Sequence, residues 1–398
     1  MKICFLTNSI FSYGGVERVV SVIASSLAEH HDVEVLCTLD KYATNRELYN
    51  LNSNVHVNIN SDIKKIGSVS KILSGAGRKI NKRTGVLNNK NMIRILQRTY
   101  YPTELKDNFI EYLNNKKYDV VIGVEGYFSL LLAIICDKLN CKVIGWQHNS
   151  YYAYFNTPKK YNYKQNALFE SYLKNLDKYI VLTDEDKNNI RKYFLADCER
   201  IYNPLSFTSP LKSECTEKNV ISVGRLVKDQ KGFDLLINAF STIAAKCRDW
   251  TLTIVGDGEE KNNLNDLINR LKLNSQIRIE PFTNEIQKYY LNSSIFVSSS
   301  RWEGFGLVIT EAMECGVPVI AFENSGPKEI INKNNENGIL VPRYNIDALG
   351  KAILDLIKDE EKRKKISKNS IERAKDFSVE NTIEKWNKLL SQVVKIEN

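Results

Sequence analysis

The sequence predicts an α/β protein with two doubly wound domains that face each other across a cleft. Three observations support this prediction. A chain of 398 residues suits two domains of about 200 residues better than one core. Both halves alternate short apolar segments with segments of helical periodicity. The short segments are runs of β-branched residues without polar alternation, which is typical of parallel strands buried on both faces.

The first half is expected to open as a strand–turn–helix unit. A strand is predicted at 2–7, followed by a turn at Gly14-Gly15 and an amphipathic helix at 16–28. Further strands are predicted at 33–37, 119–124, 142–146 and 178–182, with helices at 127–138 and 186–194. In a sheet of this kind, ligands bind outside the carboxyl ends of the strands.

The second half repeats the scheme after an interruption. Residues 203–219 contain Asn203-Pro204 and Pro210 and few apolar side chains, so a linker is predicted at 206–219. Strands follow at 220–223, 250–255, 277–279, 295–297 and 317–321. A last amphipathic helix at 379–394 is expected to dock on the first domain. The predicted domains are therefore 1–205 together with 376–398, and 220–375.

Composition and cysteine usage favour a cytoplasmic protein without a membrane span. The longest apolar run, Phe128–Cys136, is far shorter than the roughly 20 residues that a span requires. The first eight residues become polar too soon for a signal peptide. The eight cysteines are scattered and form no Cys-x-x-Cys pair, so we expect reduced thiols and no structural metal.

The net charge of +9 is concentrated in one segment, which indicates an anionic partner. No acidic residue occurs between Ile63 and Thr103, and ten lysines and arginines do: Lys64, Lys65, Lys71, Arg78, Lys79, Lys82, Arg83, Lys90, Arg94 and Arg98. Apolar residues recur among them at helical spacing: Ile63, Ile66, Val69, Leu73, Ala76 and Ile80. A basic amphipathic helix within 63–98 suits an anionic membrane surface, and a solvated helix with a charged face is the alternative. No nucleic-acid-binding module accompanies the charge, so no nucleic-acid partner is expected.

The most specific motif lies at 303–311, after the strand predicted at 295–297. Gly304 and Gly306 keep the start of the next helix free of bulky side chains, so its unpaired N–H groups can meet a diphosphate. Glu303 precedes the helix start and Glu311 follows it. Two carboxylates on either side of a diphosphate suit the hydroxyl groups of a sugar and of a ribose. For an isolated pair of this kind, a glycine turn followed by a helix with surface glutamates would be the better interpretation.

Two further loops after strands carry matching chemistry. Arg225 and Lys231 lie between the strand at 220–223 and the next helix, where two cations can neutralise a departing diphosphate. Gly256, in the Gly-Asp-Gly turn that follows the strand at 250–255, leaves space for a nucleotide. Gly15 would let backbone N–H groups of the first domain approach the same phosphates.

These motifs together resemble the retaining glycosyltransferases of family 4, which have the GT-B fold of two Rossmann-like domains. The matches are Gly-Gly-Val-Glu-Arg (14–18), Trp-Gln-His-Asn (146–149), Asn203-Pro204, Val-Gly-Arg-Leu (223–226), Lys231-Gly232, Gly-Asp-Gly (256–258), Glu-Gly-Phe-Gly-Leu (303–307) with Glu311, and Ser-Gly-Pro-Lys-Glu-Ile (325–330). The resemblance covers the second domain, the first strand–turn–helix and the closing helix. It does not extend to 60–103, and Phe282-Thr283-Asn284 replaces the usual aromatic–glycine pair that reads the base.

The resemblance implies roles for individual residues. Arg225 and Lys231 would contact the diphosphate, Glu303 the donor hexose and Glu311 the ribose. Other residues of the donor site would be Gly15, Asn203, Gly256, Phe305, Gly306 and Leu307. His148 would lie beside the anomeric carbon, unless it is only a loop or capping histidine.

Two neighbouring patterns leave alternatives open. Tyr151, Tyr152 and Tyr154 follow His148 and could stack on the sugar of the acceptor or pack within the first domain. Asp184-Glu185-Asp186 resembles a metal-binding triplet, but acidic residues in a first helical turn are also what the helix dipole favours. We adopt the second interpretation and expect neither a metal nor a cofactor.

The resulting hypothesis is a retaining glycosyltransferase that transfers a hexose or N-acetylhexosamine from a nucleotide-diphosphate sugar. The stretch 325–330 is most similar to that of enzymes that use UDP-sugars. With the basic segment, this implies a lipid-linked saccharide acceptor at the inner face of the cytoplasmic membrane and a surface polysaccharide such as O-antigen or capsule. A nucleotide-sugar epimerase of the same fold and a non-catalytic subunit of a glycosyltransferase complex are the alternatives. The intact set of Glu303, Glu311, Arg225 and Lys231 argues against the latter.

Overall fold

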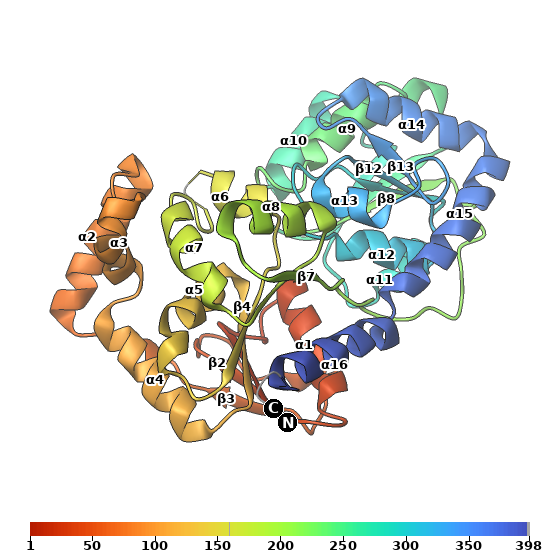
Figure 1. Ribbon diagram of the computed structural model, residues 1–398. Coiled ribbons are helices and arrows are strands. Elements are labelled where there is room, and N and C mark those ends of the chain that lie inside the picture. Colours follow the sequence, from red (N-terminus) through yellow and green to blue (C-terminus); the bar gives the residue numbers. More distant parts are fainter. Residues whose placement is uncertain (159, 396–398) are drawn as a thin grey trace. The chain divides into compact units, whose positions relative to one another are not determined.

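The computed structural model describes residues 1–158 and 160–395, and the chain divides into two compact units. The first unit comprises Met1–Pro204 and the C-terminal segment from Val379, and the second comprises Leu205–Ser378. Each unit is a parallel sheet with helices on both of its faces (Figure 1). The prediction of two doubly wound domains is therefore confirmed.

The sheet of the first unit has seven strands in the order β3-β2-β1-β4-β5-β6-β7. The strands are β1 (Lys2–Thr7), β2 (Asp32–Cys37), β3 (His56–Ile59), β4 (Val120–Val124), β5 (Lys142–Trp146), β6 (Lys178–Val181) and β7 (Cys198–Arg200). The helices are α1 (Gly15–Leu27), α2 (Ser68–Thr84), α3 (Ile93–Tyr100), α4 (Thr103–Lys116), α5 (Glu125–Ile135), α6 (Tyr151–Asn156), α7 (Asn166–Tyr172), α8 (Asp184–Phe194) and α16 (Val379–Lys395). The strand order reverses direction between β1 and β4, and this is where a doubly wound sheet opens a crevice for a ligand.

The sheet of the second unit has six strands in the order β10-β9-β8-β11-β12-β13. The strands are β8 (Asn219–Val223), β9 (Thr251–Val255), β10 (Ile277–Glu280), β11 (Ile295–Ser298), β12 (Val319–Phe322) and β13 (Ile339–Val341). The helices are α9 (Phe233–Ser241), α10 (Lys261–Arg270), α11 (Ile286–Leu291), α12 (Leu307–Glu314), α13 (Ser325–Ile330), α14 (Ile346–Lys358) and α15 (Glu360–Ala374). Here the order reverses between β8 and β11.

Helix α16 packs on the first unit, as the sequence predicts. Trp386 is completely buried, and its ring centroid lies 4.9 Å from that of Trp146 and 6.4 Å from that of Phe5. Because Phe5 is on β1 and Trp146 ends β5, the C-terminal helix belongs to the same core as the central strands. Figure 1 shows α16 beside α1, and the two helices are in contact.

The linker predicted at 206–219 is packed on the second unit. The N–H of Ser213 donates to the carbonyl of Cys315 at 2.8 Å, and its hydroxyl donates to the carbonyl of Ser293 at 2.7 Å. Cys215 is buried, and the division between the units falls after Pro204. The contacts of residues 206–219 therefore group them with the second unit, Leu205–Ser378.

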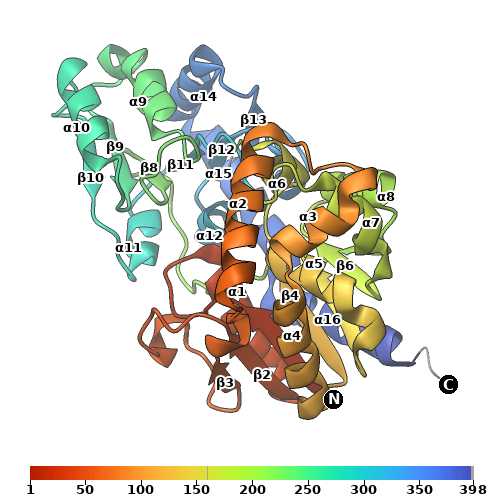
Figure 2. The same ribbon diagram turned by 90° about the vertical axis from the view of Figure 1, so that its left-hand side faces the viewer.

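The basic segment forms α2 and α3, which pack side by side (Figure 2). Helix α2 begins at Ser68, so Ile63 is not part of it; that side chain is buried in the core of the first unit. No helix within the described residues is long and apolar enough to cross a membrane.

Candidate active site

The reversal point of the second sheet brings together the loops that follow β8 and β11. The first loop carries Arg225 and Lys231, and the second carries Glu303 before α12. Lys231 Nζ lies 2.5 Å from Glu303 Oε1, and both side chains are largely buried. The Ser300 hydroxyl donates to the same carboxylate oxygen at 2.7 Å. Two residues separated by 72 positions thus form one ion pair in the crevice expected for a ligand.

The loop before α12 is held in place from both sides. The guanidinium of Arg301 donates to both carboxylate oxygens of Asp234 on α9, at 3.0 and 2.7 Å, and this pairing raises the pKa of Arg301. Asn324 Nδ2 donates to the carbonyl of Ser300 at 2.5 Å. Bidentate pairing fixes orientation as well as distance, so the Glu303 carboxylate is presented by a rigid loop.

The glycines of these loops are required by close backbone approach. A Cβ on Gly232, which has a φ of 65°, would collide with the carbonyl oxygen of Ser299. A Cβ on Gly256 would collide with the carbonyl oxygen of Gly224, because the chain segments after β8 and β9 lie against each other.

The start of α12 matches the predicted helix entrance. Gly306 precedes the helix with a φ of 108°, a conformation that favours glycine. Phe305 packs edge-on against Phe377 at 5.6 Å, so its side chain belongs to the core and only its backbone is available to a donor. Leu307, the first residue of the helix, is partly exposed. Glu311 is buried, and its Oε2 accepts a hydrogen bond from the hydroxyl of Tyr290 at 3.1 Å.

Arg225 differs from the other charged residues of this site because its side chain is exposed. It has no ion-pair partner among the described residues, whereas Lys231 is committed to Glu303. A diphosphate that enters this site could therefore pair with Arg225 directly, whereas Lys231 would first have to leave Glu303.

In the first unit, Gly15 is the exposed first residue of α1, which follows β1 at the reversal point. The preceding Gly14 donates its N–H to the hydroxyl of Tyr49 at 2.9 Å. The carboxylate of Glu17 fills the space where a Cβ of Gly14 would lie, and it accepts from the hydroxyl of Ser12 at 2.6 Å. A phosphate at this helix start would have to displace Glu17.

His148 lies directly beyond the carboxyl end of β5 and is 8% exposed. Burial lowers the pKa of His148 to about 3, so its ring is neutral at physiological pH. Both ring nitrogens are buried and lack a hydrogen-bond partner among the described residues. A neutral imidazole with two unsatisfied nitrogens, 4.2 Å from the ring of Trp146, is suited to bind a polar ligand group.

The three tyrosines after His148 have different environments. Tyr152 is exposed, and Tyr151 stacks on Tyr193 at 5.3 Å. Tyr154 is buried, and its hydroxyl oxygen accepts hydrogen bonds from the N–H groups of Gly126 at 3.3 Å and His148 at 3.5 Å. Tyr154 therefore joins the loops that follow β4 and β5.

The acidic triplet forms the first turn of α8, and Thr183 is the N-cap residue of that helix. The Thr183 hydroxyl accepts from the N–H of Asp186 at 3.1 Å and donates to its carboxylate at 2.8 Å. The other carboxylate oxygen of Asp186 accepts from the N–H of Tyr151 at 2.7 Å, and Asp184 pairs with Arg200 at 3.3 Å. Both carboxylate oxygens of Asp186 thus accept hydrogen bonds from neighbouring parts of the fold.

Asn203 is buried in the last segment of the first unit before the division, and its Oδ1 has no hydrogen-bond partner among the described residues. The structure also identifies residues that the sequence patterns do not single out. Ser300 and Arg301 orient Glu303 or its loop, and Glu125 directly follows β4 at the reversal point of the first sheet. Glu125 could have been found from the strand at 119–124, since the residue after it falls at a ligand-binding edge.

Comparison with known proteins identifies the family. The family described as Glycosyltransferase Family 4 matches residues 13–207, and the family described as Glycosyl transferases group 1 matches residues 208–373. An uncharacterized glycosyltransferase of Haemophilus influenzae is 30% identical over 348 residues, which cover 84% of this chain and 95% of that protein. The amylovoran biosynthesis glycosyltransferase AmsD of Erwinia amylovora is 25% identical and covers 98% of this chain and 99% of its own.

A crystal structure of HepE from Anabaena in complex with UDP has the same fold, with a TM-score of 0.73 at 20% identity over 98% of this chain and 100% of that one. The chain belongs to the group 1 glycosyltransferases, with a first half of the family 4 type, and is a glycosyltransferase.

Proposed function

We propose that this protein transfers a hexose or N-acetylhexosamine from a UDP-sugar to a lipid-linked saccharide with retention of the anomeric configuration. The observation that carries the proposal is the Lys231–Glu303 ion pair. A buried carboxylate held by an ammonium group and a hydroxyl can accept hydrogen bonds from sugar hydroxyl groups. The ammonium group of Lys231 can also move from Glu303 to a bound diphosphate, because the diphosphate is an anion that replaces the carboxylate as its partner.

In this mechanism, the bond between the acceptor oxygen and the anomeric carbon forms on the side from which the diphosphate departs. The bond between the anomeric carbon and the phosphate oxygen breaks, and the departing phosphate takes the proton of the acceptor hydroxyl. Arg225, Lys231 and the N–H groups at the start of α12 stabilise the developing charge. Neutral His148 contributes a hydrogen bond to the sugar, and Glu311 binds the ribose. No side chain is assigned as a nucleophile, and no metal is required.

The choice of UDP rests on likeness. HepE, which shares the fold, was crystallised in complex with UDP, and the stretch 325–330 of this chain is similar to that of enzymes that use UDP-sugars. The name of AmsD places that relative in the biosynthesis of the polysaccharide amylovoran. We infer a corresponding role for this chain in building a bacterial surface polysaccharide such as O-antigen or capsule.

The inferred membrane attachment rests on the burial pattern of α2, which exposes apolar side chains and buries polar ones. Val69, Ile72 and Leu73 are 72%, 71% and 66% exposed. The residues that α2 buries are instead polar, Ser74 and Asn81. A helix that turns its apolar stripe to solvent and its polar stripe to the protein is suited to lie in a membrane interface.

Cations accompany this apolar stripe. Ala76 and Ile80 continue the stripe, and Lys71, Lys79 and Arg83 are exposed on the same helix. Each lysine or arginine near an anionic leaflet contributes about 1 kcal/mol. We therefore place the protein in the cytoplasm, peripheral on the inner face of the cytoplasmic membrane.

The proposal is tested by transfer from radiolabelled UDP-sugars to bacterial membrane extracts. The expected product is a lipid-extractable saccharide whose new linkage has the anomeric configuration of the donor, as read from the NMR coupling constant. A GDP-sugar should not serve as donor. A product of inverted configuration, or label released only as free sugar, would contradict the proposal.

A further inference from the structure

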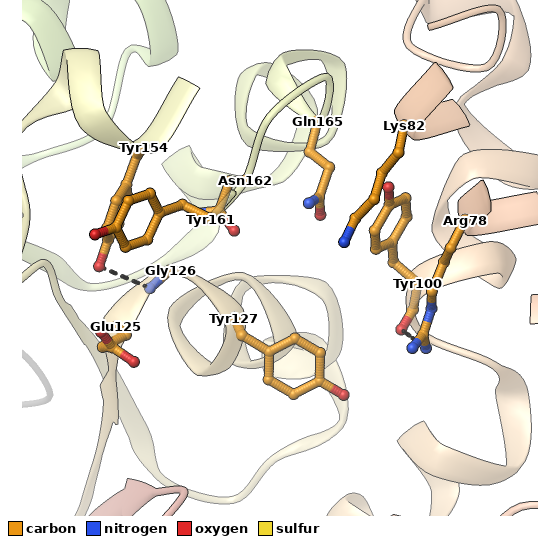
Figure 3. A pocket seen from close by; sticks show the side chains of 10 residues that line it. All are labelled: Arg78, Lys82, Tyr100, Glu125, Gly126, Tyr127, Tyr154, Tyr161, Asn162 and Gln165. Atoms are coloured by element: carbon orange, nitrogen blue, oxygen red, sulfur yellow. Dashed lines mark hydrogen bonds between the residues drawn. The ribbon is translucent and has the colours of Figure 1, made fainter. Parts of the chain in front are cut away.

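A cavity of about 250 Å³ lies within the first unit, beside the reversal point of its sheet. Figure 3 shows the side chains that line it, among them Arg78, Lys82, Glu125, Tyr127, Asn162 and Gln165. They come from α2, from the start of α5 and from the segment before α7. The first unit therefore has its own ligand-sized space at the edge where doubly wound sheets bind ligands.

One wall of the cavity is cationic and belongs to α2. Arg78 donates to the carbonyl groups of Thr99 and Tyr100, both at 3.1 Å, which fixes its guanidinium group at the wall. Lys82 lies one helical turn further, and its ammonium group has no ion-pair partner among the described residues. In Figure 3 the side chains of Lys82 and Gln165 point toward each other across the opening. One fixed and one movable cation can hold a phosphate group.

The opposite wall carries Glu125, which begins α5 with a φ of 65°, a strained conformation for a residue with a side chain. Burial and the charge of Glu17 raise the pKa of Glu125 to about 7. The next residue, Gly126, has no room for a Cβ because the amide nitrogen of Asn162 occupies that position. Glu125 therefore lines the cavity, with Arg78 and Lys82 on its other side.

We propose that this cavity binds the acceptor as a saccharide joined to a phosphate group. Arg78 and Lys82 bind the phosphate, and Glu125, with the surrounding tyrosine and amide side chains, accepts and donates hydrogen bonds to the sugar hydroxyl groups. This inference rests on the proposed function and deepens it, because it states the chemistry of the acceptor. A neutral saccharide would leave Arg78 and Lys82 without an anion.

The position of the cations on α2 connects the cavity to the membrane. Arg78 and Lys82 line the cavity, whereas the exposed Val69, Ile72 and Leu73 do not. A lipid-linked saccharide has its phosphate at the junction of sugar and lipid. If α2 lies in the membrane interface, its cations stand at the depth of that phosphate, so a lipid-linked source of the ligand fits better than a soluble one.

The experiment uses glucose 1-phosphate as the probe, with methyl α-glucoside and inorganic phosphate for comparison. UDP binding is measured first by calorimetry, and the probes are then titrated in saturating UDP so that the donor site is occupied. We expect glucose 1-phosphate to bind more tightly than either comparison compound. Lys82→Gln should weaken it by about tenfold or more, as expected for a charge-assisted hydrogen bond.

Matched variants separate this site from general charge effects. Lys79→Gln removes the same charge from an exposed position of α2 outside the cavity and should leave the affinity for the soluble probe within about twofold. Glu125→Gln should weaken glucose 1-phosphate but not inorganic phosphate. An equal effect of Lys79→Gln and Lys82→Gln, or equal binding of methyl glucoside, would overturn the proposal. If the cavity proposal failed in this way while UDP still bound normally, the assignment of the donor site would be unaffected.

A second arm tests the source of the phosphate. Neutral phosphatidylcholine vesicles carrying a polyprenyl-phosphate glucose should recruit the protein more than plain vesicles, and Lys82→Gln should abolish the difference. Recruitment that is equal for both vesicles would overturn the lipid-linked source.

Discussion

Replacing the exposed apolar residues of α2 should release the protein from membranes without destabilising it. The variant Val69→Gln/Ile72→Gln/Leu73→Gln changes three side chains that are about 70% exposed. Burying one such side chain completely is worth about 1.5–3 kcal/mol, so each regains about 1–2 kcal/mol on insertion. Three of them contribute about 3 kcal/mol or more, which corresponds to a partition coefficient lower by at least about 100-fold.

The stability of the folded protein should not change in this variant. Gln has good helix propensity, and the three side chains make little contact with the core, so the free energy of unfolding should stay within about 0.5 kcal/mol. The control is Leu195→Gln, since Leu195 is 74% exposed in the same unit but lies at the end of α8. This control should co-sediment with vesicles like the wild type.

The assay is co-sedimentation with vesicles of increasing anionic lipid content and at increasing salt. Wild-type binding should rise with anionic lipid and fall with salt, because Lys71, Lys79 and Arg83 contribute electrostatically. The triple variant should bind weakly under every condition. Wild-type-like binding by the triple variant, or the absence of wild-type binding to any vesicle, would refute the assignment of α2 as the membrane-binding helix.

Three further predictions concern the chemistry of the two units. Glu303→Ala should lower transfer by about 100-fold or more, whereas Glu311→Ala should mainly raise the Kd for UDP; near-native turnover and affinity in both would contradict the donor assignment. Chelators should leave most activity intact, and complete loss restored by manganese would restore Asp184 and Asp186 as candidate ligands, although Asp184 pairs with Arg200 and Asp186 bonds the N-cap residue Thr183. His148 has a pKa lowered to about 3, so it takes up a proton on unfolding at mildly acidic pH and folding stability falls as the pH drops from its unfolded value near 6.5 toward 3. His148→Gln should remove up to about 1.4 kcal/mol per pH unit from that fall in urea unfolding between about pH 6 and 4, and an unchanged slope would contradict the neutral buried imidazole.

The sequence predicts the central strands because they are long runs of apolar β-branched residues. The strands at 119–124 and 142–146 lie within a residue of β4 and β5. The strands that the sequence does not reveal, β3, β7 and β13, are edge strands of three or four residues. Such strands are stabilised by a single neighbour, and their short, partly polar sequences carry little periodicity.

The candidate site is predictable in part for a different reason. Glu303 and Lys231 occur in glycine-rich loops next to recognisable strands, so their meeting follows from the strand order. The role of Ser300 and Arg301 in holding the loop depends on partners far away in sequence, which no local pattern reveals. The composition of the basic segment predicts a membrane-binding helix. Which of its faces is buried, however, depends on its packing against α3, where Gly77 approaches Thr99 closely, and only the tertiary structure shows this contact.

The most direct test of the central claim is calorimetric titration of the protein with UDP and with GDP. A donor site that contains Glu303, Glu311, Arg225 and Lys231 and takes UDP-sugars should bind UDP with at least about tenfold higher affinity than GDP. Lys231→Gln, which removes the cation paired with Glu303, should weaken UDP binding by about tenfold or more. Equal affinity for the two nucleotides, or UDP binding that is unaffected by Lys231→Gln, would contradict the account.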